Sequence, residues 1–105
     1  MKKAISAGSI VAAVKDQVSA DLAGEAAILH LKSGIYYGLD PVGARIWQLL
    51  KTPRKVSQIR DALVEEYDVE TQTCEKDLAA LLEKLHEEQL IEFADEIGRR
   101  GEETA

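Results

Sequence analysis

The sequence predicts an α+β domain in which a three-stranded antiparallel sheet is followed by three helices. Two patterns along the 105 residues support this prediction. Up to about residue 39, hydrophobic and polar residues alternate with a period of two, which is typical of strands. From Asp40 onward, hydrophobic residues recur every three or four positions, which is typical of amphipathic helices. Because helices that follow a small sheet must cover one of its faces, we expect a single domain.

The three strands are expected over residues 18–22, 27–31 and 35–39. Ala23-Gly24 and Lys32-Ser33-Gly34 fall between them as turns, with Gly34 free to adopt a positive φ. The third strand is rich in aromatic residues, which favours the β conformation. The hydrophobic residues that alternate in the first two strands are Val18, Ala20, Leu22, Ala27, Leu29 and Leu31.

The three helices are expected to begin at Asp40-Pro41, at Val56 and shortly after Glu70. Asp is a preferred N-cap residue, and Pro fits the first helical position, where no N–H is needed. Thr52-Pro53 ends the first helix. The hydrophobic faces consist of Val42, Ile46, Trp47, Leu49 and Leu50 in the first helix, Val56, Ile59, Leu63 and Tyr67 in the second, and Cys74, Leu78, Leu81, Leu82 and Leu85 in the third.

Two short segments lie outside this pattern. Ile10–Val14 is a candidate for an extra strand, although its alanines weaken that prediction, and Leu90–Phe93 is a candidate for a last strand. From Ala94 onward the residues are charged or small and show no hydrophobic period. We therefore expect one domain over residues 1–93 and a disordered acidic tail over residues 94–105.

The charge distribution argues against nucleic acid as a partner. The net charge is −6, and Glu70–Ala105 contains eleven acidic residues but only four basic ones. Proteins that bind duplexes need clustered Lys and Arg against the phosphates. No hydrophobic run approaches the roughly 18 residues of a membrane span, and residues 1–8 lack a secretion signal. A cytoplasmic location without a membrane partner is therefore expected.

The residue types needed for catalysis or cofactor binding are sparse. The single cysteine, Cys74, cannot form an internal disulfide, and its place on the hydrophobic face of a helix is typical of a small buried residue. His30 is expected to be packed or half-exposed on the strand face that carries Ala26 and Ile28, and His86 to be solvated among glutamates. The glycines form no phosphate-binding motif. We therefore expect no catalytic residue, no metal and no cofactor.

The run from Gly34 to Leu50 resembles the signature of the PqqD-like family, the precursor-peptide recognition domains of ribosomal peptide natural-product pathways. The matching residues are Leu39-Asp40, Gly43-Ala44, Ile46-Trp47 and Leu49-Leu50. Residues 56–69 also resemble the second helix of the family, and the similarity spans about residues 18–93. Lys55 departs from the pattern, because relatives often carry Ser or Thr there to cap the second helix.

The resemblance implies a winged helix-turn-helix-like module that binds the leader of a precursor peptide. In such families the third strand pairs with the leader, in a groove closed by the third helix. The size of the chain, the absence of a fused enzyme and the run Tyr36–Asp40 resemble the stand-alone leader-binding proteins of lasso-peptide biosynthesis in particular. Those proteins pass the leader to a separate leader peptidase, and a cyclase then closes the ring of the core peptide.

The residues themselves point to the same strand. In a meander the third strand is an edge, and Ile35–Leu39 carries neither the lysine nor the proline that would block pairing. Tyr36 and Tyr37 face opposite sides of it, so one is expected in the core and the other in a groove or on the surface. At least two of the four leucines of the third helix are expected only to cover the sheet. The candidate peptide-binding residues are Ile35, Tyr36, Tyr37, Gly38, Leu39, Cys74, Leu78, Leu81, Leu82 and Leu85.

Two other functions remain open at this point. A winged-helix DNA-binding regulator is one, although Glu70–Phe93 carries seven acidic residues against two lysines. An adaptor that docks only to a folded modification enzyme, through the acidic tail, is the other. Whatever the function, packing in the core explains Leu39, Ile46, Trp47 and Leu49.

Overall fold

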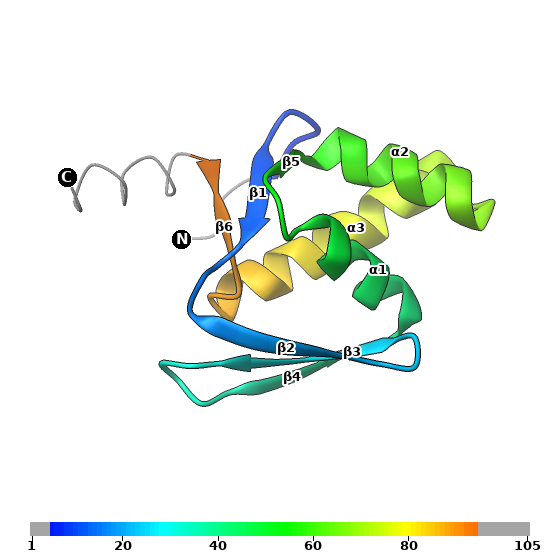
Figure 1. Ribbon diagram of the computed structural model, residues 1–105. Helices are drawn as coiled ribbons and strands as arrows, with labels where there is room; N and C mark the ends of the chain where they lie inside the picture. The colour runs from blue at the N-terminus through cyan, green and yellow to red at the C-terminus, as the bar shows by residue number, and fades with distance from the viewer. Residues whose placement is uncertain (1–4, 95–105) are drawn as a thin grey trace.

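The computed structural model describes residues 5–94, which form two antiparallel sheets and three helices (Figure 1). This confirms the predicted α+β fold with a three-stranded antiparallel sheet followed by helices. The expected tail lies outside the described residues apart from Ala94. The elements are β1 (Ile10–Ala13), β2 (Gln17–Leu22), β3 (Glu25–His30), β4 (Tyr36–Leu39), α1 (Pro41–Leu49), β5 (Arg54–Lys55), α2 (Val56–Tyr67), α3 (Thr71–Glu87) and β6 (Ile91–Phe93).

Strands β2, β3 and β4 form the sheet that the alternation predicts, here called the meander sheet. Its order is β2-β3-β4, so β4 is an edge strand, as expected. Ala23 and Gly24 both have positive φ, 55° and 89°, which suits the tight turn between two twisted strands. Gly34 has φ 73° in the turn before β4. Helix α1 lies across one face of this sheet (Figure 1).

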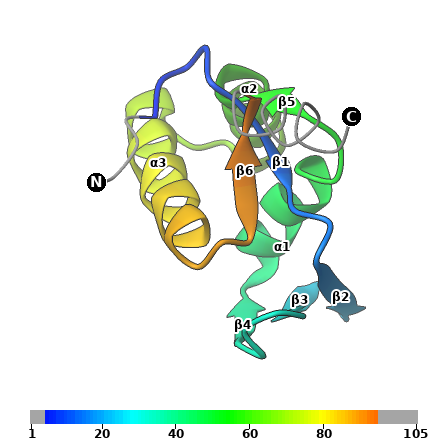
Figure 2. The ribbon, with the colours of Figure 1, turned by 90° about the vertical axis from the view of Figure 1, so that its left-hand side faces the viewer.

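A second sheet, here called the junction sheet, joins the beginning, the middle and the end of the described chain. Its order is β5-β1-β6, and Val11 pairs with both Arg54 and Phe93. The expected extra strand and last strand are therefore both present, and they pair with one another. Figure 2 shows β1 and β6 side by side, with α3 on one side and α1 on the other. The junction sheet thus holds both ends of the domain against the helices.

One continuous hydrophobic core links the two sheets and the three helices. Leu39, Ile46, Trp47 and Leu49 all belong to it, which confirms the expectation that packing explains them. His30 is also buried, and its Nδ1 accepts a hydrogen bond from the Ser33 N–H at 3.3 Å. It is therefore a packed histidine that helps to close the turn before β4.

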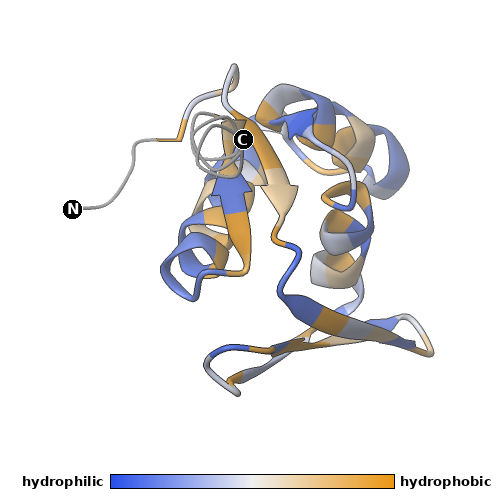
Figure 3. Cartoon of the chain, turned by 60° about the vertical axis from the view of Figure 1, so that its left-hand side comes forward, coloured by the Kyte–Doolittle hydropathy of each residue, from blue (hydrophilic) through white to orange (hydrophobic). Residues whose placement is uncertain are grey.

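The two faces of the meander sheet differ sharply. Ala26 and Ile28 are buried beneath α1, whereas the alternating residues that predicted the strands lie on the opposite face. Figure 3 shows hydrophobic and hydrophilic residues alternating along β2. Val18 and Leu22 are 57% and 55% exposed there. The alternation therefore predicted the strands, but its hydrophobic residues lie on the outward, exposed face of the sheet. None of the helices in the described part of the chain is long and apolar enough to cross a membrane.

Candidate binding groove

A groove with a cavity of about 610 Å³ lies between β4, α1 and α3. We call it the β4 groove. Its volume is in the range of known ligand sites, and most of its lining is apolar. The lining residues are Tyr37, Gly38, Leu39, Asp40, Val42, Gly43, Ile46, Leu63, Tyr67, Val69, Thr73, Cys74, Asp77, Leu78 and Leu81.

Strand β4 presents a free backbone edge to this groove. The His30 N–H donates to the Ile35 carbonyl at 3.0 Å, and Ile28 is opposite Tyr37. Because backbone groups alternate in direction along an antiparallel strand, those of Tyr37 also point toward β3. The N–H and C=O of Tyr36 and Gly38 therefore point to the open side, where no other described strand pairs with β4.

The side chains of β4 alternate in the same way. Tyr37 pairs with the buried Ile28, so its half-buried ring faces inward and lines the groove. Tyr36 pairs with Leu29 on the outward face and is 66% exposed. Ile35 is also exposed and, like Tyr36, is not part of the lining. The prediction that the two tyrosines face opposite sides is confirmed.

The start of α1 forms the floor of the groove next to β4. The Asp40 Oδ1 caps the helix by accepting a hydrogen bond from the Gly43 N–H at 2.8 Å, and Pro41 occupies the first helical position. A Cβ at Gly43 would lie 3.3 Å from the Leu39 side chain, so the small residue lets α1 approach β4 closely. The Asp-Pro signal thus predicts the start of the helix that forms this floor.

Helix α3 supplies the opposite wall. Cys74, Leu78 and Leu81 line the groove, and Leu81 is only partly buried. Leu82 and Leu85 are fully buried and lie outside the lining. These two leucines therefore pack in the common core and not in the groove. Helix α3 packs against α2 and β6 and not mainly against the meander sheet, which the third helix was expected to cover.

Sequence reasoning did not single out several of the groove residues. The missed lining residues are Val42, Ile46, Leu63, Tyr67, Val69, Thr73, Asp77, Asp40 and Gly43. A signal was present for α3, because Thr73, Asp77 and Leu81 follow one another at four-residue spacing and so lie on one side of the helix. The hydrophobic stripe alone directs attention to the neighbouring, more deeply buried side.

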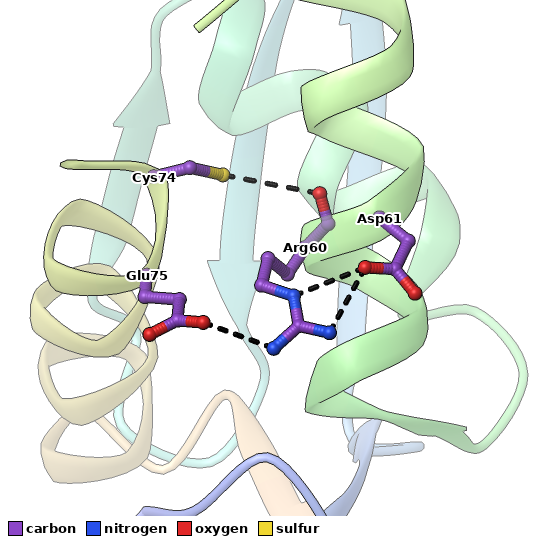
Figure 4. Close-up of polar contacts among 4 residues, drawn as sticks. All are labelled: Arg60, Asp61, Cys74 and Glu75. Atoms are coloured by element: carbon purple, nitrogen blue, oxygen red, sulfur yellow. Dashed lines mark hydrogen bonds and ion pairs between the residues drawn. The ribbon is translucent and has the colours of Figure 1, made fainter. Parts of the chain in front are cut away.

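An arginine fixes α2 against α3 behind the groove (Figure 4). Arg60 binds Asp61 on its own helix and Glu75 on α3, each at 2.9–3.0 Å. The Cys74 Sγ lies 3.9 Å from the Arg60 carbonyl oxygen, to which it donates. Burial, and next the carboxylate of Asp77, raise the pKa of the Cys74 thiol. Cys74 is therefore held as a neutral, packed side chain in the groove wall.

A second arginine ties α1 to α2. The Arg45 guanidinium binds the Glu66 carboxylate through two hydrogen bonds of 2.9 Å, one from Nε and one from Nη2. This contact holds the pKa of Glu66 below its ordinary value.

At the start of α2, the Lys55 N–H donates a hydrogen bond to the Gln58 Oε1 at 3.0 Å. The Gln58 side chain therefore provides part of the N-terminal cap for which relatives often use Ser or Thr in place of Lys55. In the described residues, no cluster of three potential metal ligands occurs.

The fold and the groove define a small α+β binding domain. The family profile for coenzyme PQQ synthesis protein D (PqqD) matches residues 25–91. The chain therefore belongs to the PqqD family, which confirms the resemblance seen in the sequence.

Two solved structures are similar over most of the chain. One, described as TbiB1 in complex with the TbiA(beta) leader peptide, is 41% identical, with a TM-score of 0.73 over 77% of this chain and 94% of that chain. The other, described as lasso peptide synthetase B1 complexed with the leader peptide, is 27% identical, with a TM-score of 0.69 over 78% of this chain and 96% of that chain. A comparison with curated protein sequences finds no match.

Proposed function

We propose that this protein binds the leader segment of a ribosomally made precursor peptide by strand addition to β4. It then delivers the leader to a separate leader peptidase or other maturation enzyme of lasso-peptide or related biosynthesis, and it is not itself an enzyme. The observation that carries the proposal is the open edge of β4 beside an apolar groove. Support comes from the two similar structures, both of which are described as complexes with leader peptides.

In this proposal the leader extends the meander sheet by one strand. Its backbone pairs with the N–H and C=O groups of Tyr36 and Gly38, which point to the open side. Every second side chain of the leader then faces inward, between β4 and α3. The inward side chains contact Tyr37 and Leu39 on the strand and Cys74, Leu78 and Leu81 on the helix.

The free-energy terms show why the groove matters as much as the edge. Ordering a peptide residue costs about 1–2 kcal/mol, whereas a backbone hydrogen bond contributes only about 0.5–1.5 kcal/mol net. Backbone pairing therefore roughly cancels the ordering cost. Net affinity comes from apolar side chains that enter the groove, at about 1.5–3 kcal/mol for each one fully buried. Leu82 and Leu85 contribute indirectly, because they pack the helix that forms the wall.

Fluorescence polarisation with a labelled TbiA(beta) leader peptide, and with leaders of small precursor genes near this chain's gene, tests the proposal. We expect saturable, largely salt-insensitive binding to at least one leader. A DNA duplex serves as the control for the regulator hypothesis. If no leader gave saturable binding, or if the duplex bound in preference, the proposal would be wrong.

The Gly38→Pro variant tests strand addition itself. The Gly38 N–H points to the open edge, so proline removes a bond to the leader and leaves the pairing with β3 in place. A Cβ at this position meets nothing within 4 Å, so Gly38→Ala is a matched control that keeps the N–H. We expect leader binding to be lost in Gly38→Pro and retained in Gly38→Ala, with both folded by circular dichroism. Equal binding by the two variants would contradict pairing at Gly38.

Delivery is tested by following cleavage of the leader by the purified leader peptidase encoded near this chain's gene. We expect this protein to accelerate cleavage, and Gly38→Pro to lose that effect while the peptidase alone is unchanged. Acceleration by Gly38→Pro as strong as by the unmodified protein would separate delivery from leader binding and favour the adaptor hypothesis.

A further inference from the structure

The β4 groove contains one carboxylate that the fold does not use. Asp40 and Asp77 are the acidic residues of the lining, and the lining contains no Lys or Arg. Asp40 is occupied as the cap of α1, where it accepts from Gly43. In the part of the chain that the structure describes, the Asp77 side chain is exposed and forms no ion pair or hydrogen bond. Its negative charge is therefore available to a molecule that enters the groove.

The helix that carries Asp77 does not neutralise it. The residues three and four positions away on α3 are Thr73, Cys74, Ala80 and Leu81, and none of them carries a positive charge. The carboxylate lies near Cys74, another residue of the lining, and after burial its charge is the next cause that raises the pKa of that thiol. Asp77 thus places a negative charge beside the apolar side chains of Leu78 and Leu81.

We propose that Asp77 selects leaders that carry a Lys or Arg at one inward-facing position of the strand paired with β4. This inference rests on the proposed function, because it assigns a side-chain preference to the same groove. A long cationic side chain can lay its methylene groups against Leu78 and Leu81 and extend its charged end to Asp77. An acidic side chain at the same place meets a like charge and loses its hydration without a partner.

A positional scan of the leader tests this preference. Each residue of the labelled TbiA(beta) leader is replaced in turn by Lys, Gln and Glu, and binding is measured with the unmodified protein, Asp77→Asn and Asp77→Lys. Asp21→Lys is the matched control, since it makes the same change of charge at an exposed residue outside the groove lining. Circular dichroism confirms that the variants are folded.

We expect one inward-facing position at which Lys binds the unmodified protein about three- to tenfold more tightly than Glu, the range for a partly exposed ion pair. Asp77→Asn should remove this preference, Asp77→Lys should reverse it, and Asp21→Lys should keep it. If the leader binds but Asp77→Lys leaves the Lys-to-Glu ratio unchanged at every position, the inference is wrong and the proposed function stands. If neither this leader nor any other binds the unmodified protein, the proposed function itself is wrong.

Discussion

The junction sheet and the meander sheet differ in the distance along the chain between their strands. In the junction sheet, β1 pairs with strands from the middle and the end of the domain, and every residue of β6 is buried. In the meander sheet, each strand pairs with its neighbour in sequence, one face is exposed, and the outer strands β2 and β4 each have an edge that pairs with no other described strand. The first sheet connects distant parts of the domain, and the second leaves side chains and backbone groups accessible at the surface.

This difference has a physical cause. A short turn closes a hairpin at a small entropic cost, so the meander sheet needs little burial and can leave a face and an edge exposed. The junction strands are brought together from distant parts of the chain, and only the burial of their side chains in the common core offsets that cost. Substitutions in the junction sheet should therefore lower the free energy of unfolding, whereas substitutions along β4 in the meander sheet should mainly change the affinity for a peptide.

The largest effect is expected in the junction sheet. Phe93 is 2% exposed in β6, and its ring meets that of His86 edge-on, with centroids 4.8 Å apart. Phe93→Ala leaves a cavity in the core and should lower the free energy of unfolding by about 3–5 kcal/mol. Urea denaturation measures the change, with the exposed Leu22→Ala in the meander sheet as control. A loss no larger than that of Leu22→Ala would show that β6 is dispensable.

Two neighbouring residues of β3 should separate the faces of the meander sheet. Ile28 is fully buried, and Ile28→Ala should cost about 2–5 kcal/mol of stability. Leu29, on the exposed face, is 40% exposed, and Leu29→Ala should cost less than about 1 kcal/mol. Both losses are read from urea denaturation. Similar losses at the two positions would mean that the outward face is covered in solution.

The two tyrosines of β4 should separate the groove from the outward face in binding. Tyr37→Ala removes a ring that lines the β4 groove, so the affinity for the leader should fall about tenfold or more. Tyr36→Ala keeps the backbone groups that we propose to pair with the leader, and it should change the affinity less than about threefold. Fluorescence polarisation measures both. A larger loss for Tyr36→Ala would place the side-chain contacts of the leader on the outward face.

The smallest effect on stability is expected for the ion pair between Arg45 on α1 and Glu66 on α2. This pair joins the helix that covers the meander sheet to the helix that follows the junction strand β5. Arg45 holds the pKa of Glu66 below its ordinary value of 4.5. The charged carboxylate therefore stabilises the fold above about pH 4.5, and this contribution is lost as the pH falls through the lowered pKa. Because both side chains are more than a third exposed, the effect should be small.

Glu66→Gln, followed by urea denaturation from pH 7 to pH 3, measures this contribution. The variant should be less stable than the unmodified protein at pH 7, and the difference should shrink as the pH falls. A difference that stays constant over this range would show that the contact acts through packing instead of charge.

Local sequence signals predicted the meander sheet and the helices, whereas the pairing of the junction sheet could not be predicted in this way. Arg54-Lys55 follows Pro53 and has no strand pattern of its own; it becomes a strand because β1 lies beside it. Ile10–Ala13 and Ile91–Phe93 show weak strand signals, but nothing local indicates that they pair with each other. Such pairing depends on how distant segments pack, which local periodicity does not report.

The candidate site shows the same limit. The edge strand and the stripe on α3 were predicted, yet the stripe is broad enough to face both the core and the groove. Helix rotation decides that Leu81 lines the groove and that Leu82 is buried, and this rotation follows from packing against the rest of the core. Asp77 was missed because a polar residue beside a hydrophobic stripe is normally solvated.

Trp47 gives the protein separate optical signals for folding and for binding. It is the single tryptophan of the sequence, it is 2% exposed, and it is absent from the lining of the β4 groove. Its emission should therefore shift strongly to longer wavelength when the domain unfolds and stay constant when a peptide enters the groove. A dye on the peptide can then report binding while the indole reports, in the same cuvette, whether a variant is still folded.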